Sequence, residues 1–311
     1  MEIDKSREYA INDMKAESIV HYIQNKYMQP VSNKEIYHYT NISGFMGIMQ
    51  SKELWATNTD YLNDKMECRQ AWQDCIKIVE GTLVEKTARN NILPLEVRES
   101  IEDEMKSKID NIYSISFCEE GDLLSQWRGY GGKGGISIGF TVVEDSKDVI
   151  GEKRPDLYSV IYDMEECNTV LKDIVDIACE NENRHKYTVA DETANYYKNM
   201  VKSICDVVRY IAPVIKNKGF REEKEIRYIW RDDQSRTIYF REKNGIIVPY
   251  IKCGLGDSKN KELSFLAIDD IIVGPQVNQI KVADSIKFYL DRGEYKNLVD
   301  KVRMSEIPYR E

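Results

Sequence analysis

The order of strand-like and helix-like segments is the feature that most constrains the fold of this chain. Short segments of alternating apolar and polar residues occur early and again after residue 224, and a mainly helical pattern fills 164–212 between them. Strands, then helices, then further strands are typical of α+β proteins. The sequence therefore predicts a mixed β-sheet with helical insertions near 64–110 and 164–212. Strands are predicted at 36–40, 54–57, 113–117, 135–140, 158–162, 224–230, 236–240, 246–251 and 268–273.

The N-terminal segment differs from the rest. Apolar residues recur at helical spacing as far as residue 28, and Pro30 ends the pattern. We interpret residues 1–34 as a helical appendage with a surface for a protein partner, and residues 35–311 as one α+β domain.

Composition excludes several classes of protein. The 311 residues are 42% apolar, enough for a core, but no segment approaches the roughly 20 apolar residues of a membrane helix. The start of the chain also lacks the apolar region of a signal peptide, so we expect a cytoplasmic protein without a membrane partner. A net charge of −9 argues against broad nucleic-acid affinity but leaves a local basic groove open. The seven cysteines form no Cys-x-x-Cys pair and are expected to be reduced and mostly buried.

Two distant segments place ionisable or polar side chains on one face of a predicted strand. His38 and Thr40 share a face near the start, and Glu223, Glu225 and Arg227 share one in the second half. Burying such groups is costly unless they line a cleft, so these five residues form the predicted site. A structural histidine and a solvated strand edge protected by charge are the alternative interpretations.

Residues beside the predicted sheet add further candidates. Tyr130 precedes a glycine-rich run whose backbone can approach a ligand closely, and it is the candidate for stacking on that ligand. Trp127 is expected in the core. Asn63 and Asp64 precede a predicted helix, where both an ordinary helix start and a direct role in binding a cofactor are open.

Several blocks, in the same order, resemble a widespread bacterial family of uncharacterised proteins. The resemblance covers residues 35–311 and implies no particular chemistry. The blocks are Tyr37-His38-Tyr39-Thr40, Gly44 through Met49, Leu54-Trp55, Asn63 through Glu67, Trp127 through Tyr130, Lys216 through Arg227, and Ser305 through Arg310.

A second resemblance, to the ADP-ribosyltransferase superfamily, rests on fewer residues. The strand with His38-x-Thr40, a capped helix and a short extended segment are similar to the first block of those enzymes, and Glu223-x-Glu225 looks like their late-strand glutamate motif. The resemblance implies a split mixed sheet, and NAD as a substrate for modifying a macromolecule, either protein or nucleic acid. Bacterial proteins with such domains are often toxins or phage-defence effectors.

The same resemblance implies a role for each matching residue. His38 and Thr40 would hold the nicotinamide riboside, Tyr130 would stack on nicotinamide, and Glu225 would be the catalytic acid, with Glu223 positioning the acceptor. Arg227 would pair with the pyrophosphate or keep the glutamates charged. The chain departs from the superfamily pattern because we find no central serine–threonine–serine or glycine–tyrosine block.

Two other functions fit the same residues. A metal-dependent nuclease or hydrolase would use His38, Asp64, Glu67, Glu223 and Glu225 around a divalent cation, since oxygen-rich clusters suit magnesium. A non-enzymatic domain would bind a nucleotide and signal through the N-terminal helix.

Overall fold

The computed structural model describes residues 2–28, 31, 34–62, 73–79, 81–82, 103, 112–131, 134–142, 157–184, 190–231, 236–256 and 263–308. The chain divides into two compact units. The helical unit comprises 1–29, 59–112 and 160–219, and the sheet unit comprises 30–58, 113–159 and 220–311. Each unit is therefore assembled from segments that are distant in sequence.

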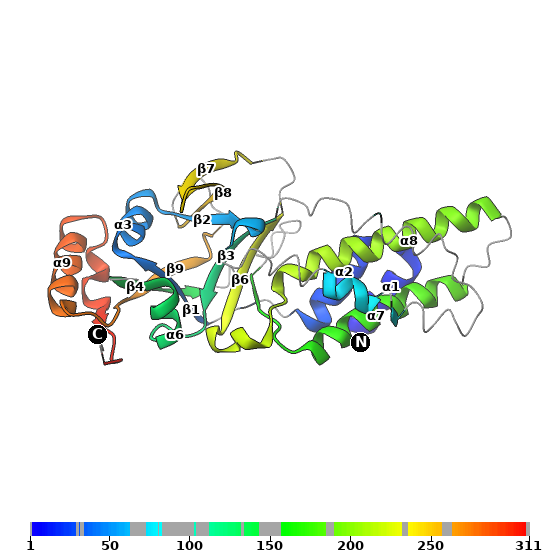
Figure 1. The fold of residues 1–311 in the computed structure, drawn as a ribbon, viewed down its shortest axis with the longest axis horizontal. Helices are drawn as coiled ribbons and strands as arrows, with labels where there is room; N and C mark the ends of the chain where they lie inside the picture. Colours follow the sequence, from blue (N-terminus) through cyan, green and yellow to red (C-terminus); the bar gives the residue numbers. More distant parts are fainter. Residues whose placement is uncertain are drawn as a thin grey trace. The chain divides into compact units, whose positions relative to one another are not determined.

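The sheet unit is built on a mixed sheet, which has ten strands among the described residues (Figure 1). The main path runs β10-β9-β4-β1-β3-β2-β8-β7, while β6 pairs with both β3 and β5. The β9–β10 pair is parallel, and β1–β4, β2–β8 and β7–β8 are antiparallel. The strands are β1 (Glu35–Asn41), β2 (Glu53–Asn58), β3 (Ile112–Cys118), β4 (Gly135–Val142), β5 (Leu157–Ser159), β6 (Glu225–Arg231), β7 (Tyr239–Lys243), β8 (Ile246–Gly254), β9 (Leu266–Val273) and β10 (Val302–Met304).

The sheet branches at β3. This strand pairs with β1, β2 and β6, although a strand has only two hydrogen-bonding edges. Its ladder with β1 has one register pair, Tyr37 with Cys118, and its ladder with β2 lies near the other end, where Ser114 faces Thr57. β1 and β3 therefore diverge beyond their single pair.

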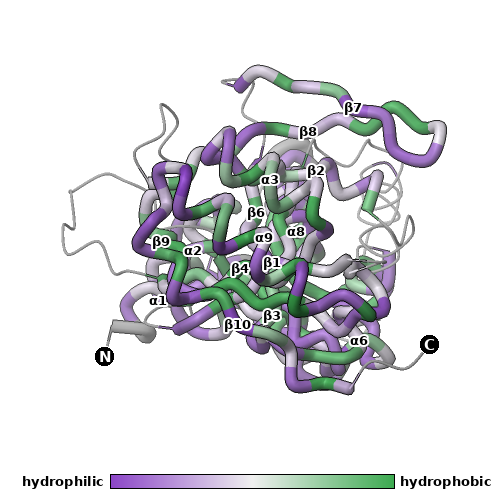
Figure 2. The backbone as a smooth tube through the Cα atoms, turned by 90° about the vertical axis from the view of Figure 1, so that its left-hand side faces the viewer, coloured by the Kyte–Doolittle hydropathy of each residue, from purple (hydrophilic) through white to green (hydrophobic). Residues whose placement is uncertain are grey.

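Two helices contribute to the main core of the sheet unit. They are α3 (Ile42–Ser51) and α9 (Gln279–Arg292). Phe45 of α3 and Leu290 of α9 belong to the same buried cluster as Ile138 of β4 and Ile226 of β6. The β7–β8 hairpin carries both hydrophobic and hydrophilic residues along its length (Figure 2). Shorter helical turns are α6 (Leu124–Gln126), the π-helical turn η2 (Trp127–Gly131), and the 3₁₀ helices η4 (Lys218–Glu223) and η5 (Lys296–Lys301).

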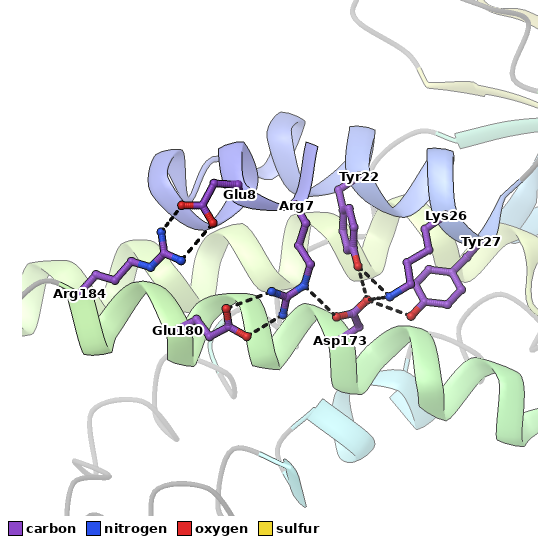
Figure 3. A network of polar contacts seen from close by, with 8 residues as sticks. All are labelled: Arg7, Glu8, Tyr22, Lys26, Tyr27, Asp173, Glu180 and Arg184. Atoms are coloured by element: carbon purple, nitrogen blue, oxygen red, sulfur yellow. Dashed lines mark hydrogen bonds and ion pairs between the residues drawn. The ribbon is translucent and has the colours of Figure 1, made fainter. Parts of the chain in front are cut away.

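The helical unit contains α1 (Glu2–Asp13), α2 (Ala16–Tyr27), α7 (Met164–Arg184) and α8 (Ala190–Ile211). Polar contacts connect α1 and α2 to α7 (Figure 3). Asp173 of α7 accepts hydrogen bonds from Tyr22 and Lys26 of α2, both at 2.8 Å. The N-terminal segment, predicted as an appendage, thus forms two helices within a unit that also contains 160–219.

The α+β class predicted from the sequence is confirmed. Each predicted strand overlaps an observed one, whereas α9 and β10 were outside the prediction. Most of the helices predicted near 64–110 lie outside the described residues. In the described part of the chain, none of the helices has the length and apolar character that crossing a membrane requires.

Candidate functional site

His38 lies on β1 where this strand separates from β3. Side chains along β1 alternate, because Ile36 joins the main core while Tyr37 and Tyr39 join a smaller apolar cluster. His38 is partly exposed, and its ring packs edge-on against Phe117 of β3, with ring centroids 5.9 Å apart. Alternation therefore places His38 on the core side of β1.

A backbone carbonyl fixes the tautomer of His38. Nδ1 lies 3.0 Å from the carbonyl oxygen of Ser116 on β3. A carbonyl only accepts hydrogen bonds, so Nδ1 carries the proton and Nε2 keeps a lone pair in the neutral ring. Burial lowers the pKa of His38 below its usual 6.5, although the bond to Ser116 opposes this shift. Within the part of the chain that the structure describes, Nε2 has no protein partner, so it can accept a hydrogen bond from a ligand.

Thr40 packs against the start of α3. Asn41 caps this helix, because its Oδ1 accepts a hydrogen bond of 2.8 Å from the backbone N–H of Gly44. A Cβ atom added to Gly44 would lie 2.0 Å from Oγ1 of Thr40. The hydroxyl of Thr40 therefore occupies space that only a glycine at position 44 leaves open.

Glu225 and Arg227 form a buried ion pair within β6. Nε of Arg227 donates to Oε1 of Glu225 at 2.7 Å, and Nη2 donates to Oε2 at 2.9 Å. The exposed fractions of the two residues are 5% and 1%. Ile226 and Tyr228 belong to the main core, so the ion pair lies on the opposite face of β6. A bidentate guanidinium favours the ionised carboxylate and holds it in one geometry.

Glu223 does not continue this strand. It ends η4, and Lys224 adopts a φ of 44° before β6 begins at Glu225. A residue in the left-handed region interrupts strand alternation. The prediction that Glu223 shares a strand face with Glu225 and Arg227 is therefore wrong. Glu223 is partly exposed, and its backbone carbonyl accepts a hydrogen bond of 3.4 Å from Gln126.

β3 separates the strand of His38 from the strand of Glu225. Backbone groups of successive residues point to alternate edges of a strand. The Ser116 carbonyl binds His38, whereas the Glu119 N–H donates to the carbonyl of Lys224 at 3.0 Å, so the two contacts use opposite edges. Alternation also puts Glu225 on the face away from the main core. The structure thus places His38 and Glu225 on the two strands that flank β3, and not side by side on one face.

Trp127 is buried, whereas Tyr130 in the same turn is 38% exposed. The Trp127 ring packs edge-on against Tyr39, with centroids 4.7 Å apart, which confirms its predicted core location. Cβ atoms added to Gly135 and Gly274 would lie 2.9 and 2.8 Å from Cε3 of Trp127. The indole therefore explains these two glycines without a ligand. The role of Tyr130 in stacking stays a prediction.

No pattern in the sequence singles out Asp122, yet this residue connects the block that begins at Trp127 with the block that begins at Ser305. Oδ1 accepts hydrogen bonds from Nε1 of Trp127 at 2.7 Å and from Oγ of Ser305 at 2.5 Å, and Oδ2 accepts one from the N–H of Glu306 at 2.9 Å. An isolated aspartate after a strand gives no pattern of its own. The resemblance of both the Trp127 and Ser305 blocks to one family is the signal that they meet in space.

Asn63 and Asp64 lie outside the described residues, so their predicted part in cofactor binding stays a prediction. The same holds for Glu67, which the metal-dependent alternative uses. Among the residues that are described, no group of three or more His, Cys, Asp or Glu side chains is arranged to hold a metal ion.

A family model described as a protein of unknown function (DUF2971) matches residues 126–228. The matched segment contains Trp127, Tyr130, Glu225 and Arg227. It agrees, over this segment, with the resemblance to an uncharacterised family. No curated protein and no solved structure matches the chain.

Proposed function

We propose that the sheet unit is an NAD-dependent ADP-ribosyltransferase that modifies a macromolecule. The observation that carries this proposal is the imidazole of His38, whose Nδ1 is held by Ser116 while Nε2 remains an acceptor where β1 leaves β3. A ribose hydroxyl is a donor of the kind that this nitrogen accepts. In the ADP-ribosyltransferases that the early segment resembles, the motif histidine holds the ribose of NAD. The resemblance therefore implies this role for His38, with Thr40 beside it.

Glu225 would provide the negative charge that the reaction needs. When the bond between nicotinamide and ribose breaks, nicotinamide leaves with the bonding electron pair and positive charge develops at the ribose C1′. A carboxylate near that centre opposes the charge and lowers the barrier. Arg227 supports this role because its two hydrogen bonds keep Glu225 ionised and oriented. The nucleophile of the acceptor then bonds to C1′ and loses its proton, and Glu223 would position that acceptor.

The two groups lie on opposite faces of the strands that flank β3, because His38 is on the core side of β1 and Glu225 is on the face of β6 away from the core. Neighbouring strands lie about 4.8 Å apart, so β1 and β6 are separated by about 10 Å across β3. The proposed riboside binds at His38, where β1 leaves β3, with Tyr130 available to stack on nicotinamide. The proposal therefore requires Glu225 to reach the riboside from the opposite face, and the Glu225 variant tests this requirement.

The metal-dependent hydrolase uses Asp64 and Glu67, which lie outside the described residues, so it stays an alternative that the chelator experiment below tests. The non-enzymatic nucleotide sensor shares the His38 contact but needs no role for Glu225.

Titration of NAD into the wild-type protein, with and without a chelator, tests these functions together with an assay for released nicotinamide. We expect binding and release that the chelator does not affect. His38→Ala should weaken NAD binding by up to about ten-fold, the typical net worth of one hydrogen bond. Phe288→Ala, an exposed aromatic on α9, is the matched control and should bind NAD as the wild type does.

Each other outcome selects against the proposal. Chelator-sensitive activity without NAD binding would establish the metal-dependent alternative. NAD binding without nicotinamide release, even with proteins and nucleic acids offered as acceptors, would leave only a sensor.

A further inference from the structure

The outer face of β2, β8 and β7 carries a cluster of aromatic and cationic side chains. We call it the aromatic platform and define it as Trp55, Tyr239, Arg241, Tyr250 and Lys252. The register pairs Trp55 with Lys252 and Tyr239 with Tyr250, so these side chains share one face. The other face of β2 and β8 enters the main core. Trp55 is 41% and Tyr239 39% exposed, so both rings present area to solvent.

The rings of the platform form a continuous stack. Trp55 and Tyr250 are stacked with centroids 4.5 Å apart and an interplanar angle of 28°. Tyr239 extends the row, because its centroid lies 5.7 Å from that of Tyr250 at an angle of 31°. These rings are nearly parallel, whereas buried aromatic neighbours elsewhere in the sheet unit, such as Phe117 and Phe140, meet at 86°. The two outer rings, Trp55 and Tyr239, are partly exposed and flank the buried Tyr250, so each offers a surface on which a further planar ring can stack.

Arg241 is held in the platform without an acidic partner. Its guanidinium lies 5.5 Å from the ring centroids of both Trp55 and Tyr250, and Nη2 donates to Oγ1 of Thr57 at 2.8 Å. Nε is buried and has no hydrogen-bond partner, and the described residues provide no carboxylate for this cation. Burial lowers the pKa of Arg241. A half-buried cation in this position is therefore stabilised by an added anion.

Two lysines make the surroundings of Arg241 more positive. Lys243 follows it on the same face of β7, and burial together with the charge of Arg241 lowers the pKa of Lys243. Lys252 lies 4.7 Å from the ring centroid of Tyr239 and is 3.4 Å from a carboxylate oxygen of Glu53. The platform thus combines stacked rings with Arg241 and Lys252 and has Lys243 beside it, although the whole chain carries a net charge of −9.

Charged residues on β7 also have a plainer interpretation, since charge protects an edge strand from pairing with other chains. That interpretation requires exposed charges and does not explain a half-buried Arg241 beside two rings.

We propose that the aromatic platform binds unpaired nucleotides of a single-stranded nucleic acid, with bases stacked on Trp55 and Tyr239 and phosphate next to Arg241. Sequence-tolerant binding of single strands commonly combines stacking rings with a cationic groove. This inference is independent of the proposed NAD chemistry.

Fluorescence anisotropy with labelled oligonucleotides of about ten nucleotides tests the platform. The probes are single-stranded DNA, single-stranded RNA and a blunt DNA duplex. We expect both single strands to bind more tightly than the duplex, and the comparison of RNA with DNA shows whether a ribose hydroxyl contributes. Trp55→Ala should weaken single-strand binding by about 5-fold to 150-fold, the range measured for losing one stacked base.

Two further variants separate stacking from charge and from loss of structure. Arg241→Gln should lower affinity and reduce the dependence of log K on log salt by about 0.7, since one phosphate contact is lost. Tyr239→Ser, at an exposed edge position, gives a second test of stacking if Trp55→Ala does not fold. Phe288→Ala removes another exposed aromatic that has an arginine at its ring, Arg292, and should leave binding unchanged.

Equal affinity for duplex and single strands would overturn the proposal. So would equal effects of Trp55→Ala and Phe288→Ala in folded proteins. A wild type that binds no oligonucleotide even at low salt would also overturn it.

Discussion

The helical unit contains a partly buried charged cluster and the sheet unit a buried ion pair, and the two are built differently. Asp173 of α7 accepts hydrogen bonds from Tyr22, Lys26 and Tyr27 and lies 3.7 Å from Nε of Arg7, so it connects three helices (Figure 3). The ion pair in the sheet unit joins two residues of one strand. The first cluster holds separate elements together, whereas the bonds between Glu225 and Arg227 lie within one strand.

We propose that the ion pair in the sheet unit, and not the cluster in the helical unit, takes part in chemistry. Burying a charge costs free energy because the charge loses its contact with water. An ion pair between separate elements offsets this cost and also holds those elements together. Burial alone would raise the pKa of Asp173, but the hydrogen bonds from Lys26, Tyr22 and Tyr27 hold it below its usual value. Glu225 and Arg227 are more deeply buried, and their mutual bonds join neighbours on β6. The catalytic role that we propose for Glu225 supplies a functional reason for burying this pair.

Replacing Glu225 should have the largest effect. We expect Glu225→Gln to lower the rate of nicotinamide release by about 100-fold to 1000-fold, because the charge opposing the oxocarbenium is lost. The same change leaves Arg227 buried without its carboxylate, so the free energy of unfolding should also fall, by about 3–5 kcal/mol. Activity is measured below the unfolding transition of the variant. The double variant Glu225→Gln/Arg227→Gln should recover part of the stability but none of the activity, and recovery of both would show that the pair is structural.

Asp173→Asn is the counterpart in the helical unit. It removes the charge that accepts from two tyrosines and a lysine, so we expect a loss of about 3 kcal/mol in the free energy of unfolding. NAD turnover should stay at the wild-type level as long as the protein is folded. Urea denaturation and the nicotinamide assay on one preparation measure both. Loss of turnover in folded Asp173→Asn would erase the distinction between the clusters.

The pH dependence of stability should reveal the neutral imidazole. The folded pKa of His38 is lowered from 6.5, so below pH 6.5 the unfolded state binds a proton that the folded state does not. Stability should therefore fall as the pH drops from 6.5 toward the folded pKa, and NAD binding should weaken with protonation of Nε2. Denaturation of wild type and His38→Ala is compared above about pH 5, where few carboxylates titrate. If the slope of the free energy of unfolding against pH is the same in His38→Ala as in the wild type, the assignment of a neutral imidazole to His38 is wrong.

The smallest effect is expected at the exposed end of the polar network in Figure 3. Arg184 donates to both carboxylate oxygens of Glu8 on the surface, where water and salt screen the charges. Arg184→Gln should leave the midpoint of thermal unfolding within the error of the measurement. A decrease approaching that of Asp173→Asn would show that the whole network, and not Asp173 alone, holds the helices.

Local patterns predicted much of the fold because they depend on near neighbours. Alternation located the strands, and helical spacing located the helical segment at 164–212. The pattern failed where one backbone angle intervened, since the left-handed Lys224 removes Glu223 from the strand face that its spacing predicts. A lysine gives no sequence signal for that conformation, in contrast to a glycine.

Contacts between distant residues were the other part that the sequence did not predict. The partner of His38 is the backbone carbonyl of Ser116, and every residue has such a carbonyl, so residue types carry no information about it. Asp122 likewise meets Ser305 only through the fold. For the candidate site, the sequence supplied the residue types and the strands, whereas the branching at β3 decided which of them are neighbours.

The packing of Trp127 has a consequence for how this protein can change during evolution. Gly135 and Gly274 are far apart in the chain, but each stands within 3 Å of the indole when a Cβ is added. A smaller side chain in place of the indole would not by itself make room, because a Cβ on Gly135 would also lie 2.7 Å from Cα of Gly131 and one on Gly274 would lie 3.0 Å from the carbonyl oxygen of Gly135. Both glycines should therefore resist replacement during evolution, and because Gly135 begins the strand that pairs with β1, this packing constrains the strand carrying His38 without involving any ligand.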